Sequence, residues 1–216
     1  AEVDDEVHAI VLTGTGRAFC AGIDLKEAGA IGFGARQRPA SERSMSELFD
    51  SLSTPVIAAV NGFAITGGFE LALMCDFRIA STEARFADTH ARLGVVPGWG
   101  LSQRLPHLIG APRAKELSLT GNYLDAETAA SWGVVNRVVG VAELMPTSIA
   151  LASDIAGCAG PVQTEIKALI ESSVNVSLAD GLRHERSVAD AHNGSVAGSD
   201  IETRRKSVLA RGREQS

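Results

Sequence analysis

The feature that most constrains the fold is an apolar run, Pro55–Val60 (PVIAAV), which ends at the turn pair Asn61-Gly62. A run this short, rich in branched residues and closed by a turn signal, is typical of a buried strand. A segment of helical character follows at Gly68–Cys75, and a further strand is predicted at Phe77–Ala80. Together the three segments predict a β-α-β unit, which is typical of an α/β core.

Two more strands are predicted on either side of this unit. His8–Thr13 is rich in branched residues and ends at Gly14, and Ala84–Ala87 is a short apolar run. Ala28–Ser44 is rich in glycine and has no clear periodicity, so we expect a mobile surface loop there.

From Gly98 onward the pattern predicts helices, because apolar residues recur at spacings of three and four. The segments concerned are Pro112–Thr120, Ala126–Trp132, Ala142–Ala156 and Thr164–Ser173. Asp125 and Ser177 are expected to cap helix starts, and Gly121 and Gly157 to end helices.

Composition excludes several classes of protein. The chain carries 20 Lys and Arg against 26 Asp and Glu, a net charge of −6, which argues against nucleic-acid or membrane partners. No apolar run is long enough to cross a bilayer, and no signal-peptide pattern opens the chain. Three widely separated cysteines, Cys20, Cys75 and Cys158, are typical of reduced thiols. We therefore expect a cytoplasmic protein, and one without a metal, since no cluster has metal-ligand spacing.

The first candidate for chemistry is the turn after the predicted strand at His8–Thr13. Its G-x-G at residues 14–16 suggests a dinucleotide site, but Phe19 stands where the third glycine belongs, and the glycines could serve backbone geometry alone. A third interpretation concentrates on Cys20–Asp24, where small residues leave the backbone bare and Asp24 can cap a helix beginning at Leu25. Exposed N–H groups there can bind an anion or a polarised carbonyl.

The second candidate is the turn at Gly67 and Gly68, directly before a helical run, with Glu70 in the first helical turn. Glu70 could simply stabilise the positive end of the helix dipole. Alternatively, the two bare turns could each point one N–H group into a shared cleft. Two such donors on one oxygen form an oxyanion hole.

Three segments, taken in this order, resemble the enoyl-CoA hydratase/isomerase (crotonase) superfamily, and the resemblance continues over essentially the whole chain. They are VLTGTGRAFCAGIDLKE, PVIAAVNGFAITGGFELALMCDFRIAS and ARFADTHARLGVVPGWG. The resemblance implies an α/β crotonase (ClpP-like) fold of stacked β-β-α units. It also implies a core over residues 1–140 and a helical oligomerisation region over residues 141–216, which forms homotrimers or hexamers. Family members begin with a β-hairpin and helix that precede the start of this chain, so we expect the N-terminal part of the core to be missing.

The resemblance further implies an acyl-CoA thioester as substrate, with coenzyme A as part of the substrate and no separate cofactor. Its carbonyl would accept hydrogen bonds from the backbone N–H groups of Ala21 and Gly67. The residues expected to line the thioester and CoA site are Ala21, Gly22, Ile23, Asp24, Leu25 and Gly68.

Hydration of an enoyl-CoA needs a base to activate water and an acid to protonate the α-carbon. Hydratases of the family commonly use two glutamates; Glu70 matches the first, and His90 stands at the position of the second. A histidine can move protons near neutral pH. If the segment is extended, Asp88 shares the face of His90, and a structural Asp88–His90 pair beside Arg92 is the alternative.

The sequence thus predicts a lyase that hydrates an α,β-unsaturated acyl-CoA, with Glu70 as the general base and His90 in the catalytic site. A double-bond isomerase is an alternative because it can work with one carboxylate, and thioester hydrolysis or decarboxylation also remain open. An alternative of another class is a non-catalytic acyl-CoA or RNA binder, against which the acidic charge balance argues.

Overall fold

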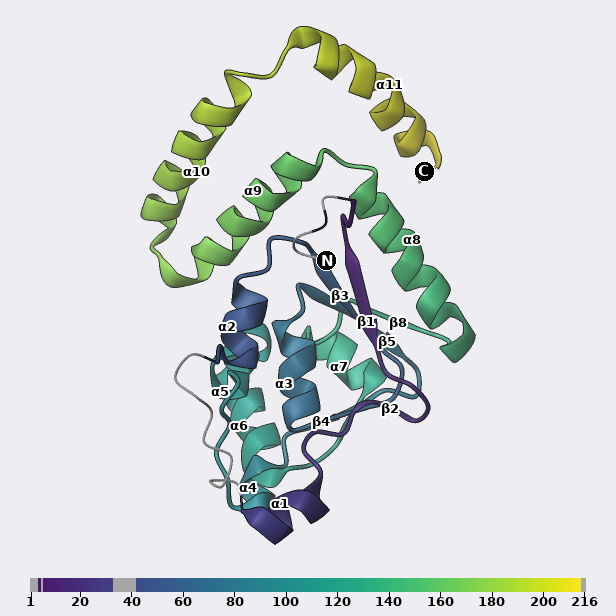
Figure 1. The fold of residues 1–216 in the computed structure, drawn as a ribbon, viewed down its shortest axis with the longest axis vertical. Coiled ribbons are helices and arrows are strands. Elements are labelled where there is room, and N and C mark those ends of the chain that lie inside the picture. Colours follow the sequence, from purple (N-terminus) through teal and green to yellow (C-terminus); the bar gives the residue numbers. More distant parts are fainter. Residues whose placement is uncertain (1–3, 5, 33–41, 215–216) are drawn as a thin grey trace. The chain divides into compact units, whose positions relative to one another are not determined.

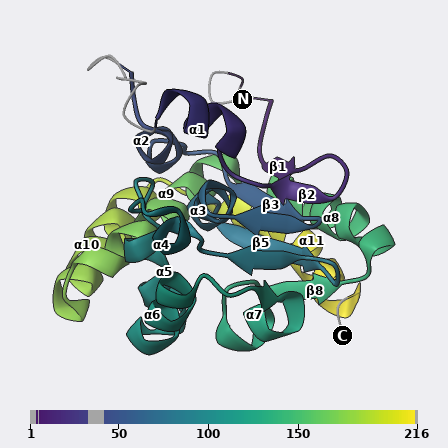
Figure 2. The same cartoon turned by 90° about the horizontal axis from the view of Figure 1, so that it is seen from below.

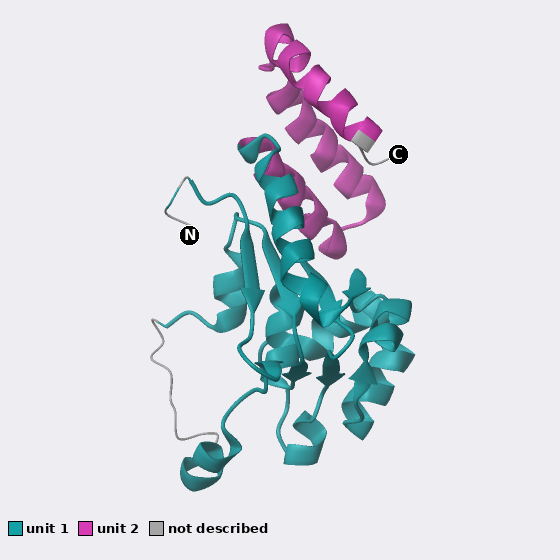
Figure 3. Ribbon diagram, turned by 90° about the vertical axis from the view of Figure 1, so that its right-hand side faces the viewer, with its two compact units in different colours: residues 1–160 teal, residues 161–216 magenta. Residues whose placement is uncertain are grey.

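The computed structural model describes residues 4, 6–32 and 42–214, and Figure 1 shows their secondary structure. The chain divides into two compact units, Ala1–Gly160 and Pro161–Ser216 (Figure 3). The strands in the described part of the chain all belong to the first unit.

Two four-stranded sheets form the centre of the first unit. The first has the order β1-β3-β5-β8, with all neighbouring strands parallel. The second has the order β2-β4-β6-β7, with only β6 and β7 antiparallel. The strands are β1 (Ile10–Thr13), β2 (Ala18–Cys20), β3 (Val56–Val60), β4 (Phe63–Ile65), β5 (Phe77–Ser81), β6 (Arg85–Ala87), β7 (Leu124–Asp125) and β8 (Arg137–Val139).

A β-β-α unit occurs three times along the chain. Each unit places one strand in the first sheet, the next strand in the second sheet, and then a helix. The three helices are α1 (Leu25–Ile31), α3 (Gly67–Met74) and α4 (His90–Leu93). The stacked β-β-α architecture expected from the resemblance is therefore confirmed.

The central strand β3 explains why its sequence is a continuous apolar run. All five of its residues are buried. Val56, Ala58 and Val60 belong to the core cluster that includes Phe69 of α3. The alternate side chains of β3 belong to a second cluster, formed with α8 (Leu144–Ala156), which contacts β1, β3 and β5 (Figure 2). A strand covered on both faces has no polar face to show in its sequence.

The other helices of the first unit are α2 (Met45–Asp50), α5 (Leu101–Ile109), α6 (Ala111–Thr120) and α7 (Ala126–Trp132). The second unit contains α10 (Leu178–Asn193), α11 (Gly198–Glu214) and all of α9 (Gly160–Ser172) except its first residue. Short 3₁₀ turns cover Val141–Glu143 and Ser173–Asn175. In the described part of the second unit, through residue 213, every residue is at least partly exposed in the single chain.

The predicted strands and helices are confirmed, with ends that move by a few residues. Asp125 and Ser177 cap α7 and α10 as predicted. The loop predicted over Ala28–Ser44 is wrong at its start, because α1 continues to Ile31. Ala28 is a buried residue of this helix. Residues 33–41 of this prediction lie outside the described residues. The sequence pattern does not predict the short strand β4, because the pair Asn61-Gly62 indicates only the end of a strand.

A buried arginine joins three elements of the first unit. Arg78 of β5 donates from Nε to the carbonyl of Val134 (2.5 Å) and from Nη1 to the carbonyls of Cys75 (3.1 Å) and Ala72 (3.4 Å). These bonds connect the end of α3 and the segment before β8 to β5. Burial lowers the pKa of the Arg78 guanidinium, and the charges of Cys75 and Asp76 partly oppose this shift.

Replacement of Arg78 tests this connection. Arg78→Met should lower the free energy of unfolding by about 2–3 kcal/mol, because buried carbonyl groups lose their donors. The control is Arg137→Met, at an exposed position on the neighbouring strand β8, which should change it by less than about 0.5 kcal/mol. Urea unfolding followed by circular dichroism measures both, and equal midpoints for the two variants would contradict the assigned role.

Candidate active site

The site lies where three parallel strands of the second sheet end. β2, β4 and β6 are neighbours and run in the same direction, so the segments that follow them emerge at one edge of the sheet. These segments are the turn at Ala21–Asp24, the start of α3 at Thr66-Gly67, and Asp88–His90. Residues far apart in the sequence therefore meet at this edge.

The first two of these turns touch through their backbones. A Cβ atom added to Gly68 would overlap the carbonyl group of Cys20, and one added to Gly22 would lie 3.0 Å from the carbonyl oxygen of Ile65. Gly22 also has a φ of +85°, which glycine adopts without strain. The two turns that the sequence could not show to converge are thus in direct contact.

The residue directly before α3, at the edge of the site, has a strained backbone conformation. Thr66 precedes the helix with φ 54° and ψ −110°, a conformation that non-glycine residues rarely adopt. Its hydroxyl forms a short hydrogen bond with the hydroxyl of Thr89 and accepts one from the backbone N–H of Thr89 (3.3 Å). The first N–H groups of α3, beginning at Gly67, have no acceptors within the helix and can be offered to a ligand.

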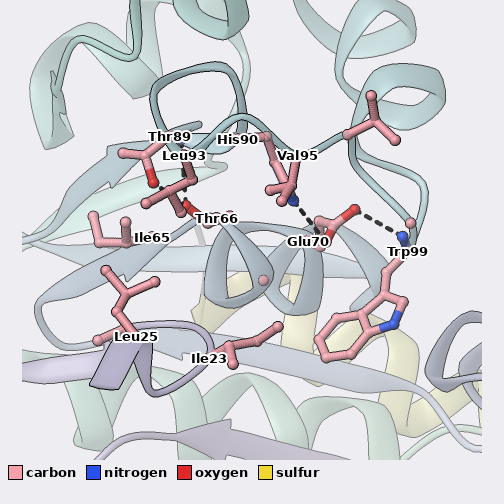
Figure 4. Close-up of a pocket in the computed structure, with 14 residues that line it drawn as sticks. Ile23, Leu25, Ile65, Thr66, Glu70, Thr89, His90, Leu93, Val95 and Trp99 are labelled. Atoms are coloured by element: carbon pink, nitrogen blue, oxygen red, sulfur yellow. Dashed lines mark hydrogen bonds and ion pairs between the residues drawn. The ribbon is translucent and has the colours of Figure 1, made fainter. Parts of the chain in front are cut away.

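A cavity of about 350 Å³ opens over these strand ends (Figure 4). Most of its wall is apolar, and its polar side chains are Glu70, His90, Thr66 and Thr89 together with the indole of Trp99. The lining residues are Ala21, Ile23, Leu25, Ile65, Thr66, Gly67, Glu70, Thr89, His90, Leu93, Val95, Val96, Gly98 and Trp99. A mostly apolar pocket with a few convergent polar groups is the usual form of a small-molecule site.

Glu70 is held in place by the start of α5. Its side chain is almost fully buried, and Oε1 accepts hydrogen bonds from the backbone N–H groups of Trp99 (2.8 Å) and Leu101 (3.3 Å). The second oxygen, Oε2, faces His90 (Figure 4). Glu70 is therefore more than a partner of the helix dipole: one oxygen is anchored and the other is directed at the pocket.

His90 lies between two carboxylates. Its Nδ1 is 2.6 Å from Asp88 Oδ1, and its Nε2 is 3.7 Å from Glu70 Oε2. All three side chains are buried. The extended segment considered for Asp88 and His90 is wrong, because β6 ends at Ala87 and His90 begins α4. Arg92 is exposed and donates to the side chain of Asn122, so it lies apart from this group.

The structure places six of the predicted site residues in the pocket wall: Ala21, Ile23, Leu25, Gly67, Glu70 and His90. Gly22 and Gly68 lie behind the wall, in the contact between the two turns. Asp24 caps α1, accepting from the N–H groups of Lys26 and Glu27. The role of each residue toward a ligand stays a prediction.

Several pocket residues were not predicted from the sequence. Thr66, Thr89, Leu93, Val95 and Val96 belong to turns and to a four-residue helix, which carry no periodic signal. Trp99 also stands in the wall beside Glu70 (Figure 4). The described residues contain no cluster of His, Cys, Asp or Glu side chains that could hold a metal ion.

Comparison with known proteins agrees with the fold. Residues 1–197 match the family described as enoyl-CoA hydratase/isomerase. The chain is 37% identical to a probable peroxisomal enoyl-CoA hydratase of Arabidopsis thaliana, over 97% of this chain and 78% of the relative. It is 40% identical to a probable enoyl-CoA hydratase of Rhizobium meliloti, over 86% and 72%. Its structure resembles that of an enoyl-CoA hydratase from Bacillus anthracis, with a TM-score of 0.82 and 34% identity over 95% of this chain and 81% of that one.

The contact between the two turns leads to a prediction about Gly68. Gly68→Ala should lower the free energy of unfolding by about 3 kcal/mol, because the new Cβ overlaps the backbone at Cys20. Gly29→Ala is the matched control: it is an exposed position inside α1 with nothing within 4 Å of an added Cβ, and it should be neutral or slightly stabilising. Chemical unfolding compares the two, and a tolerated Gly68→Ala would show that the turns need not touch.

Proposed function

The chain belongs to the enoyl-CoA hydratase/isomerase family, and on this premise we propose that it adds water to an α,β-unsaturated acyl-CoA thioester to form the 3-hydroxyacyl-CoA. The observation that carries the proposal is the pair formed by Glu70 and His90, which face one another in the pocket at 3.7 Å. Both side chains can transfer protons, and both lie beside the two bare turns.

The turns supply the electrostatic part of the mechanism. Once the thioester carbonyl points at the contact between the turns, the N–H groups of Ala21 and Gly67 donate to its oxygen. These donors stabilise the negative charge that develops there when the β-carbon is attacked and the enolate forms. Loss of one donor from such a hole typically raises the barrier by about 2.7–4 kcal/mol.

Glu70 and His90 supply the proton transfers. A water molecule at hydrogen-bond distance from both Glu70 Oε2 and His90 Nε2 fits the geometry, because the two atoms lie only 3.7 Å apart. Glu70 takes a proton from this water while the oxygen of the water forms a bond to the β-carbon. Protonated His90 then donates a proton from Nε2 to the α-carbon of the enolate. Transfer of the proton from Glu70 to His90 restores both groups, and one water has been added.

The remainder of the pocket suits an aliphatic acyl group. Ile65, Leu93 and Val95 supply apolar surface near the catalytic pair, and Ile23 and Leu25 supply it on the side of α1. A saturated chain buries apolar area there, while the thioester stays near the turns.

No described helix is both long and apolar enough to cross a membrane. Cys20 and Cys158 are free thiols, which supports the proposal of a cytoplasmic location.

We also propose that the enzyme is a homotrimer or a hexamer, with its helical C-terminal region (residues 141–216) in the interface. The support is the surface of the second unit, whose large apolar side chains are left exposed in the single chain. They include Ile170 at 65% and Leu178 at 79% exposure. Exposed apolar surface of this kind on a soluble protein marks an interaction site.

The oligomer is tested by light scattering coupled to size-exclusion chromatography. The full chain should elute with three or six times the mass of one chain. The double variant Ile170→Glu/Leu178→Glu should give smaller species, because buried unpaired charges oppose association. A wild-type protein that elutes as a monomer would contradict the proposal.

The activity is tested with crotonyl-CoA, whose conjugated thioester absorbs in the ultraviolet and loses its band on hydration. Wild-type protein should remove the band, and Glu70→Gln and His90→Ala should each lower kcat by about 10²–10⁴-fold, because each removes a group that transfers a proton. Arg137→Met, which changes an exposed residue of β8, is the control. Binding of crotonyl-CoA without loss of the band would reject hydration, and 3-enoyl-CoA substrates would then test the isomerase.

A further inference from the structure

We propose that Asp88 is a positioning residue of this site: it orients the imidazole of His90 and stabilises its protonated form, so that Nε2 acts as the proton donor. The proposal rests on the hydratase function above and adds a third residue to the pair. Asp88 does not line the pocket and acts only through His90.

The contacts of Asp88 fix the histidine in two ways. Its Oδ1 accepts a hydrogen bond from the backbone N–H of His90 at 3.1 Å and lies 2.6 Å from His90 Nδ1. One oxygen thus holds both the main chain and the ring of the same residue. A carboxylate oxygen accepts and does not donate, so in the proposed arrangement Nδ1 carries a proton toward Asp88, and the other ring nitrogen, Nε2, is left facing Glu70.

Asp88 is buried, and its carboxylate has few partners. The side chain is 1% exposed, and Oδ2 has no hydrogen-bond partner among the described residues. Within the described part of the chain, His90 is the basic group at ion-pair distance from this carboxylate. A buried carboxylate that lacks compensation is costly, so in the proposed role the charge of Asp88 is balanced by the positive charge on His90 when that ring acts as the proton donor.

Among the described residues, no other charged group lies at ion-pair distance from Nδ1 of His90. Glu70 is the second ion-pair partner of His90 in the described chain, and it faces Nε2 rather than Nδ1. α6 packs against α4, but its charged side chains Arg113, Lys115 and Glu116 are all exposed. The imidazole therefore lies between a buried acceptor on one side and the proposed general base on the other.

A purely structural role would not require a carboxylate. An asparagine at position 88 could also accept the hydrogen bond from Nδ1 through its amide oxygen, without burying a charge. What the aspartate adds is the negative charge that favours a protonated ring. This difference makes Asp88→Asn the informative substitution, since it keeps the size and the acceptor and removes the charge.

The test is a double-mutant cycle on kcat and KM with crotonyl-CoA, using the full chain as wild type, Asp88→Asn, His90→Gln and the double variant. Asp88→Asn should lower kcat by about 10²-fold and leave KM nearly unchanged, because proton donation and not binding is impaired. In the His90→Gln background the same change should have no further effect. Asp125→Asn, at an exposed N-cap position of α7, is the matched control and should retain full kcat.

Each outcome decides the question. An unchanged kcat in Asp88→Asn, a change in KM alone, or losses that multiply in the double variant would overturn the positioning role while wild-type hydration stands. If wild type itself does not hydrate crotonyl-CoA, the proposed function fails and this inference fails with it. Thermal melting checks folding; if Asp88→Asn is unfolded, Asp88→Ser takes its place in the cycle, and unfolding of both variants would show a structural role instead.

Discussion

The contact between the backbones of Gly68 and Cys20 is the constraint on which the site depends. It brings the end of β2 against the start of α3, with no room for a side chain between them. Any residue larger than glycine at position 68 would separate the two turns. The N–H groups of Ala21 and Gly67, proposed to bind one carbonyl oxygen, would then no longer share a target. The packing of one helix on one turn thus sets the geometry of the whole pocket.

The same edge of the sheet concentrates three buried ionisable side chains, Asp88, His90 and Glu70, where a core would normally exclude them. Their burial is unfavourable unless the charges compensate one another. The surrounding fold holds them together: the apolar strand β3 and its two packed faces stabilise the sheet, and the start of α5 anchors Glu70 with two N–H groups. A site with three buried ionisable side chains lowers the free energy of unfolding, and the packing of the apolar core offsets this loss.

Prediction from the sequence succeeded where a residue type has a local cause. Gly67 and Gly68 before a helical run, and Glu70 in its first turn, mark a helix start whatever the rest of the chain does. Prediction failed where a feature depends on residues from another part of the chain. Thr66 and Thr89 look like ordinary turn residues, and their hydroxyls meet only because β4 and β6 are neighbours. Asp88 and His90 would share a face if the segment after Ala87 were extended, but a four-residue helix begins at His90.

By itself the sequence determined which segments are strands and helices, where caps and glycine turns interrupt them, and that Glu70 stands at a helix start. These are local properties, set by periodicity, capping and backbone freedom over a few residues. Only the tertiary structure decided that the ends of β2, β4 and β6 share one edge, and that His90 faces Glu70 with Asp88 behind it. The reason is that strand order and helix packing join residues from separate segments, such as Cys20 and Gly68 or Glu70 and His90, and no local pattern records such pairings.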